Sequence, residues 1–140
     1  MAKRVFIIHG WDGYPEEGWF PWLKKELEQK GFQVYIPAMP EPAEPKIEAW
    51  VSYLSEIVGD VDGDTFFVGH SIGCQAILRY LESLSADKKI GGTVLVAGWL
   101  TRLTGDLGAG EMEIARPWIE TPIDHDKIKK NLSENHGHLF

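Results

Sequence analysis

The chain has 140 residues, enough for one domain with a buried core, and its 44% hydrophobic and 25% charged residues are ordinary for a globular protein. A formal net charge of −7 argues against nucleic acid and anionic membrane surfaces as partners. A single cysteine excludes an internal disulfide, and the first residues contain no apolar stretch long enough for a signal peptide or a membrane span. We therefore expect one cytoplasmic domain, residues 1–140, with no membrane partner.

Short apolar runs alternate with helical repeats along the chain. Buried strands are predicted at 4–8, 32–36, 65–68 and 93–97, because these runs are apolar and bounded by glycine, proline or acidic turns. Helices are predicted from Pro21 to Gly31, from residue 47 to Gly59, over 72–84, and from an Asp124 cap to residue 132. Prolines make 37–45 an extended loop, and 98–122 is predicted to be irregular, with room for a short helix.

This alternation predicts an α/β fold with a doubly wound parallel sheet and helices on both faces. Ligands bind such sheets outside the carboxyl ends of the strands, where the strand order reverses. If the first strand lies between the second and third, the loop 9–13 comes to lie beside the turn after the third strand. That loop has neither a G-x-G-x-x-G pattern nor a phosphate-binding lysine, so a nucleotide site is the weaker interpretation.

The turn after the third strand reads Gly69-His70-Ser71-Ile72-Gly73, a G-x-S-x-G pattern between a strand and a helix. This is the context of a nucleophile elbow, in which a sharp turn exposes the serine hydroxyl at a helix N-terminus. The N–H of Ile72 is one donor for the oxyanion that serine attack creates, and the N–H of Trp11 after the first strand is the expected second. A glycine-rich turn with a helix-capping serine is the simpler alternative.

Beyond these motifs the chain resembles the small serine hydrolases of the α/β-hydrolase superfamily. The resemblance runs from about Val5 to Asn131, and its matching segments are 7–11, 18–23, 67–74, 95–98 and 122–129. It implies a carboxylesterase-like hydrolase that cleaves small acyl esters or amides through an acyl-serine on Ser71, without a metal or cofactor. On the same basis the backbone amides of Trp11 and Ile72 match the oxyanion hole.

The resemblance also implies a later strand with an acidic loop and a G-H loop that carry the triad acid and base. This chain stops at Phe140, so we expect a sheet that is incomplete at its C-terminal edge. None of the chain's histidines and acidic residues near its end convincingly supplies the two missing groups: His9 and His70 are expected to shape loops, His125 to be solvated, His136 and His138 to lie in the tail, and Asp124 and Asp126 to belong to the last helix. Residues 136–140 are hypothesised to be a frameshifted tail.

Three further expectations follow from these observations. Cys74 is expected to be a buried filler, with a reactive thiol as the alternative. An incomplete sheet would leave the fourth strand as an edge, which predicts homo-oligomerisation through that edge. The competing function is a catalytically incompetent fragment or a non-enzymatic ligand- or protein-binding module on the same scaffold.

Overall fold

The computed structural model describes residues 3–97 and 109–132. The helices and strands alternate in chain order: β1 (Arg4–Ile8), α1 (Phe20–Gln29), β2 (Gln33–Tyr35), α2 (Ile47–Val58), β3 (Thr65–His70), α3 (Ile72–Ser83), β4 (Gly92–Val96), α4 (Ala109–Glu120) and α5 (His125–Lys129). No described helix combines the length and the apolar character that crossing a bilayer requires.

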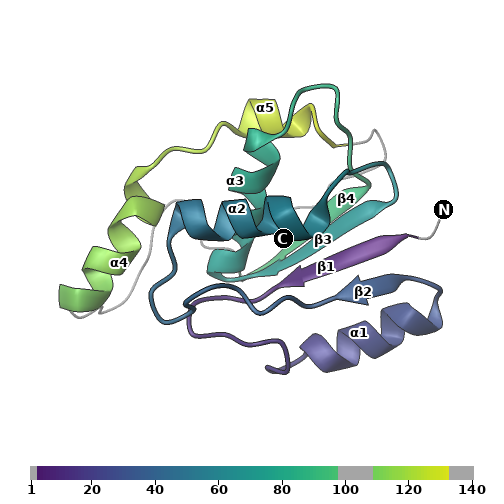
Figure 1. Cartoon of the computed structure of the whole chain (residues 1–140), viewed down its shortest axis with the longest axis horizontal. Helices are drawn as coiled ribbons and strands as arrows, with labels where there is room; N and C mark the ends of the chain where they lie inside the picture. The colour runs from purple at the N-terminus through teal and green to yellow at the C-terminus, as the bar shows by residue number, and fades with distance from the viewer. Residues whose placement is uncertain (1–2, 98–108, 133–140) are drawn as a thin grey trace.

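The four described strands form one parallel sheet in the order β2-β1-β3-β4. β1 therefore lies between β2 and β3, and the strand order reverses beside it, which is the arrangement that brings the loop 9–13 to the turn after β3. Along β1, Val5 pairs with Val34 on one side and with Phe66 on the other. Figure 1 shows α1 on one face of the sheet and α2 and α3 on the other. The predicted parallel sheet with helices on both faces is confirmed.

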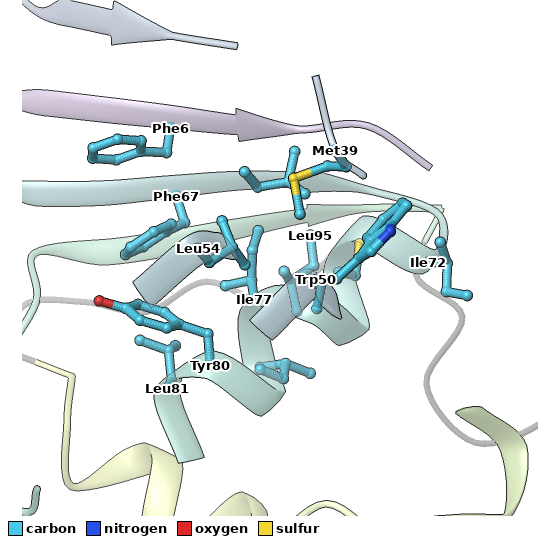
Figure 2. Packing of buried hydrophobic residues seen from close by; sticks show 14 of the residues in the cluster. Phe6, Met39, Trp50, Leu54, Phe67, Ile72, Ile77, Tyr80, Leu81 and Leu95 are labelled. Carbon is cyan, nitrogen blue, oxygen red and sulfur yellow. The ribbon is translucent and has the colours of Figure 1, made fainter. Parts of the chain in front are cut away.

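Each face of the sheet has its own hydrophobic core because successive side chains of β1 point to opposite faces. Val5 and Ile7 pack with Phe20 of α1, whereas Phe6 and Ile8 pack with α2 and α3. The larger core contains Trp50 and many aliphatic side chains, and Figure 2 shows its labelled members gathered between sheet and helices. Val34, between exposed neighbours, is the core residue of the short edge strand β2.

Helix ends follow the predicted turn chemistry. Gly31 and Gly59 end α1 and α2 with φ angles of 92° and 66°, values that disfavour residues with a Cβ. The Asp124 carboxylate accepts a hydrogen bond of 3.0 Å from the Lys127 N–H and caps α5, as predicted. β2 is shorter than expected, β3 extends two residues further to His70, and β4 begins and ends one residue earlier.

The segment 98–122, predicted to be irregular with room for a short helix, holds a longer helix than expected in its second half. Residues 109–120 form α4, a helix of 12 residues that contains Pro117. Pro117 removes one backbone donor, which disfavours a helix at this position. Tertiary contacts outweigh this cost, because Ala115 and Trp118 are buried in the larger core. The Arg79 guanidinium of α3 also donates to the carbonyls of Trp118 (3.0 Å) and Thr121 (2.8 Å) at the end of α4.

Candidate active site at the carboxyl edge of the sheet

Ser71 lies in the sharp turn between β3 and α3 with φ 55° and ψ −125°. A positive φ at a residue with a Cβ costs about 1–3 kcal/mol, so surrounding contacts must hold this conformation. The Ser71 N–H donates to the Val96 carbonyl at the end of β4 (3.1 Å), and its own carbonyl accepts from the Cys74 N–H (3.0 Å). Hydrogen bonds to β4 on one side and to α3 on the other therefore hold the elbow in this conformation.

Two glycines of the motif are required by close approach. A Cβ on Gly73 would lie 2.3 Å from the Ile8 carbonyl oxygen and 2.6 Å from that of His9. A Cβ on Gly69 would lie 2.9 Å from Cα of Cys74. The first turn of α3 therefore packs directly on the backbone at the end of β1, and β3 on the backbone of α3.

The loop after β1 reaches the serine. A Cβ on Gly10 would lie 2.9 Å from the Ser71 Cβ and 3.4 Å from its Oγ. Trp11 follows in a turn that is held by two hydrogen bonds, from the Asp12 N–H to the Pro42 carbonyl (2.8 Å) and from the Gly13 N–H to the Gly10 carbonyl (3.0 Å). The loop 9–13 thus lies beside the elbow.

Two backbone donors flank this junction. Ile72 is the first residue of α3, so its N–H has no carbonyl one turn earlier in the helix to bond to. Among the described residues, no acceptor is recorded for the N–H of Ile72 or of Trp11. The Trp11 side chain points to a different partner, with its indole Nε1 donating to the Ala43 carbonyl (3.0 Å). Within residues 3–97 and 109–132, both backbone N–H groups are thus available to a bound molecule.

Both ring nitrogens of His9 form hydrogen bonds to the backbone. The Met39 N–H donates to its Nε2 (3.0 Å), so its Nδ1 carries the proton and donates to the Gly10 carbonyl (2.8 Å). The ring is fully buried against Trp50, and burial lowers the pKa of His9 from its ordinary value of 6.5. Neutral His9 therefore fixes the loop that precedes Trp11, and its expected loop-shaping role is confirmed.

His70 contacts aromatic side chains on the α1 face of the sheet. Its ring lies 5.8 Å from that of Trp19 and 5.9 Å from that of Phe20, both edge to face. Its Nδ1 is buried without a hydrogen-bond partner among the described residues. Among the described residues, ring packing and not a side-chain hydrogen bond through Nδ1 positions His70, whose expected loop-shaping role stays a prediction.

Cys74 is fully buried in the first turn of α3. Its Sγ donates to the Val96 carbonyl at 3.6 Å, and burial raises the pKa of the thiol to about 12. Because the thiolate is the reactive form, this environment makes the thiol unreactive. Cys74 is therefore a buried filler, as expected, in an environment that disfavours the thiolate.

The acid and base candidates of α5 lie far from Ser71. The ammonium of Lys127 donates to the carbonyls of Leu81 (3.3 Å) and Leu84, at the opposite end of α3 from the elbow. Twelve helical residues separate the two ends by about 18 Å. Asp124, His125 and Asp126 are exposed there, and His136 and His138 lie outside the described residues. Among the described residues, none is hydrogen-bonded to the Ser71 hydroxyl.

The comparisons with known proteins agree with this geometry. A family model described as serine hydrolase matches residues 5–121. The chain is 39% identical over 128 residues to the putative hydrolase YdeN of Bacillus subtilis, covering 91% of this chain and 64% of that protein. It is 34% identical over 132 residues to the serine hydrolase RBBP9 of Rattus norvegicus, covering 93% of this chain and 66% of that protein. The chain thus spans about two thirds of the length of these relatives.

Two crystal structures resemble the fold. The ydeN gene product of B. subtilis superimposes with a TM-score of 0.85 at 36% identity, over 99% of this chain and 70% of that one. The monoacylglycerol lipase of Paleococcus ferrophilus superimposes with a TM-score of 0.62 at 22% identity, over 84% of this chain and 47% of that one. The second likeness concerns the fold alone.

Proposed function

The chain belongs to the serine hydrolase family and has an α/β-hydrolase type of fold, and we propose that it cleaves small acyl esters or amides through an acyl-serine on Ser71. The observation that carries this proposal is the elbow itself. Ser71 has a positive φ, and the loop after β1 approaches its hydroxyl closely. A turn that served only to begin a helix would not require this backbone conformation or this approach.

In the proposed reaction the Ser71 Oγ attacks the substrate carbonyl carbon while a base accepts the hydroxyl proton. The N–H groups of Trp11 and Ile72 donate to the oxyanion that forms, which is stabilised further by the N-terminus of α3. Collapse breaks the bond to the leaving alcohol or amine, which takes up the proton. Water then attacks the acyl-serine, releases the carboxylic acid and restores the hydroxyl.

This reaction needs a base that no described residue provides at Ser71. We place the base and its acid outside the described residues, in keeping with the triad order Ser, acid, His of this fold. Without a base, the rate is expected to fall by several orders of magnitude, leaving only catalysis by the oxyanion donors.

Labelling with a fluorophosphonate probe tests the proposal, because the probe reacts only with an activated serine in an assembled site. Labelling of the folded protein that is lost in Ser71→Ala and persists in Ser52→Ala, which removes an exposed hydroxyl on α2, would support an assembled site on Ser71. Labelling that persists in Ser71→Ala would refute the assignment of the nucleophile.

A non-enzymatic binding module is the second candidate, and it is favoured by the lack of a described partner for the Ser71 hydroxyl. A folded protein that the probe does not label would support this alternative. For the location of the protein we propose the cytoplasm, on the basis of its acidic composition and its single, buried cysteine.

A further inference from the structure

A groove of about 1050 Å³ lies between α4 and the segment that leads into α2. Figure 1 shows α4 beside this segment, at the N-terminal end of α2. None of the described residues that line the groove belongs to the elbow or to the loop 9–13. A ligand of the groove therefore does not have to reach Ser71.

Hydrogen bonds hold the two walls of the groove together. The Trp118 indole Nε1 donates to the Pro45 carbonyl (2.9 Å), which joins α4 to the segment before α2. Arg79, which is 5% exposed, donates to the carbonyls of Trp118 and Thr121 at the end of α4. The Gln75 amide oxygen accepts from the same guanidinium (2.8 Å and 3.1 Å). The groove is thus formed before a ligand binds, which lowers the entropic cost of binding.

Apolar side chains line both walls of the groove. Ile47 and Ala49 lie on one wall, and Ile114 and Pro117 lie on the other. Ala49 and Pro117 are exposed, and the two isoleucines are half-buried, so a bound molecule can contact all four side chains. Removal of such apolar surface from water is the main favourable contribution to most protein–protein association.

The α4 wall is one face of a helix. Gly110, Ile114, Pro117 and Thr121 recur at intervals of four, three and four residues. At about 1.5 Å per residue this wall is about 17 Å long, the length of about three helical turns. A Cβ added to Gly110 would meet no atom within 4 Å, so the groove is open at that end. A second helix of about three turns, lying along α4 with an apolar stripe against the wall, matches these dimensions.

Carboxylates lie on both walls of the groove. Glu44 and Glu48 are on one wall and Glu111 and Glu113 on the other, together with one lysine. Glu113 pairs with Arg116 (2.9 Å). For the other three glutamates, all exposed, no ion pair is recorded among the described residues. The rim of the groove therefore attracts cationic side chains on both sides of a bound segment and repels anionic ones.

We infer that the groove is a docking site for a basic amphipathic helix of a partner protein. The apolar stripe of this helix covers Ile47 and Ile114, and lysines or arginines on either side of the stripe face the glutamates of the rim. The same glutamates disfavour an acidic or phosphorylated segment and an anionic membrane surface. The inference goes beyond the proposed function, because docking does not require the chemistry at Ser71.

Fluorescence anisotropy of a labelled synthetic peptide tests the inference. The peptide has about 14 residues, with leucines at the i, i+3, i+4 and i+7 spacing of one helical face and lysines elsewhere. A control peptide has the same composition in an order without the stripe. We expect saturable binding of the first peptide and at least about tenfold weaker binding of the control. Equal affinity for the two peptides would overturn the inference.

A third peptide tests the helical conformation of the occupant. It carries a proline in place of one central lysine, which breaks the helix and leaves the leucines unchanged. We expect its dissociation constant to rise at least about tenfold. Unchanged affinity would show that an extended segment binds, and would overturn the assignment of a helix.

Two pairs of protein variants locate the binding site. Ile114→Lys places a cation on the apolar wall and should raise the dissociation constant at least about tenfold. Met112→Lys is its control, because it adds the same charge at an exposed residue of the same helix that does not line the groove.

The second pair changes only exposed residues, so it tests the inference even if Ile114→Lys does not fold. Glu48→Lys combined with Glu111→Lys reverses the charge on both walls and should raise the dissociation constant about tenfold, an effect that shrinks in high salt. Glu28→Lys combined with Glu56→Lys is the control, because it changes the net charge equally at exposed residues outside the groove. We expect this control to stay within about twofold of the wild type.

Equal weakening by a variant and its control would overturn the inference, because it would show only the general attraction between a basic peptide and an acidic protein. Ser71→Ala should bind the peptide as tightly as the wild type does. Loss of binding in Ser71→Ala would place the peptide in the candidate active site and would likewise overturn the inference. Self-association that Ile114→Lys abolishes, without binding of the peptide, would assign the groove to a second copy of the chain instead.

Discussion

The close packing of α3 on β1 makes Gly73→Ala the most informative single change. The added Cβ would lie 2.3 Å from the Ile8 carbonyl oxygen, whereas an ordinary contact is at least 3.4 Å. The first turn of α3 must therefore move away from β1 by about 1 Å. Overpacking of this kind costs about 3 kcal/mol, and the better helix propensity of alanine returns about 1 kcal/mol. We expect a net loss of about 2 kcal/mol.

Urea unfolding followed by tryptophan fluorescence measures this loss. With a slope of about 2 kcal/mol per molar, the midpoint should fall by about 1 M. Gly110→Ala is the matched control, because its Cβ meets nothing within 4 Å and the helix gains up to about 1 kcal/mol. The displaced turn also carries the N–H of Ile72, so fluorophosphonate labelling should slow as well. A Gly73→Ala midpoint equal to that of the wild type would refute the argument from close packing.

The remaining predictions concern four other positions. Arg79→Met should destabilise the protein by about 3 kcal/mol and make α4 sensitive to proteases, because it removes the donors to one buried and one partly buried carbonyl; unchanged proteolysis would contradict this. Since the folded pKa of His9 is lowered, the unfolded chain binds more protons, so stability should fall as the pH drops below about 6.5, with a smaller fall in His9→Gln. Cys74 should resist alkylation at pH 8 unless the protein is unfolded, which mass spectrometry would detect. Val94, 38% exposed on β4, which pairs with β3 alone among the described strands, should support self-association that Val94→Lys weakens; a monodisperse wild-type monomer in light scattering would exclude it.

Much of the site could be predicted because its signals are local. The strand, the G-x-S-x-G turn and the helix are contiguous in the sequence. The close packing of this turn needs residues without a Cβ, and the sequence has Gly69 and Gly73 there. The assignment of Ser71 as nucleophile, and of Trp11 and Ile72 as donors, stays a prediction until the protein is labelled. The proposed frameshift at residues 136–140 lies outside the described residues and stays a hypothesis for DNA sequencing.

The length of α4 could not be predicted, for a physical reason. Ile114 and Trp118 have the spacing of one helical face, but Pro117 lies between them and favours a break. Only long-range contacts, from Arg79 and Pro45, stabilise the helix and bring it to α2. In the sequence, Ala115 and Trp118 have the three-residue spacing of one helical face, and this spacing was the available sign of a buried helix.

The sequence by itself determined the alternation of strands and helices, the caps and the elbow, because each depends on hydrophobic period and turn chemistry within a few residues. The tertiary structure alone decided which segments meet. In the tertiary structure the His9 ring accepts from the Met39 N–H, Asp124, His125 and Asp126 lie at the far end of α3, and Trp118 of α4 donates to the Pro45 carbonyl. These outcomes depend on contacts between residues distant in sequence, which no local pattern encodes.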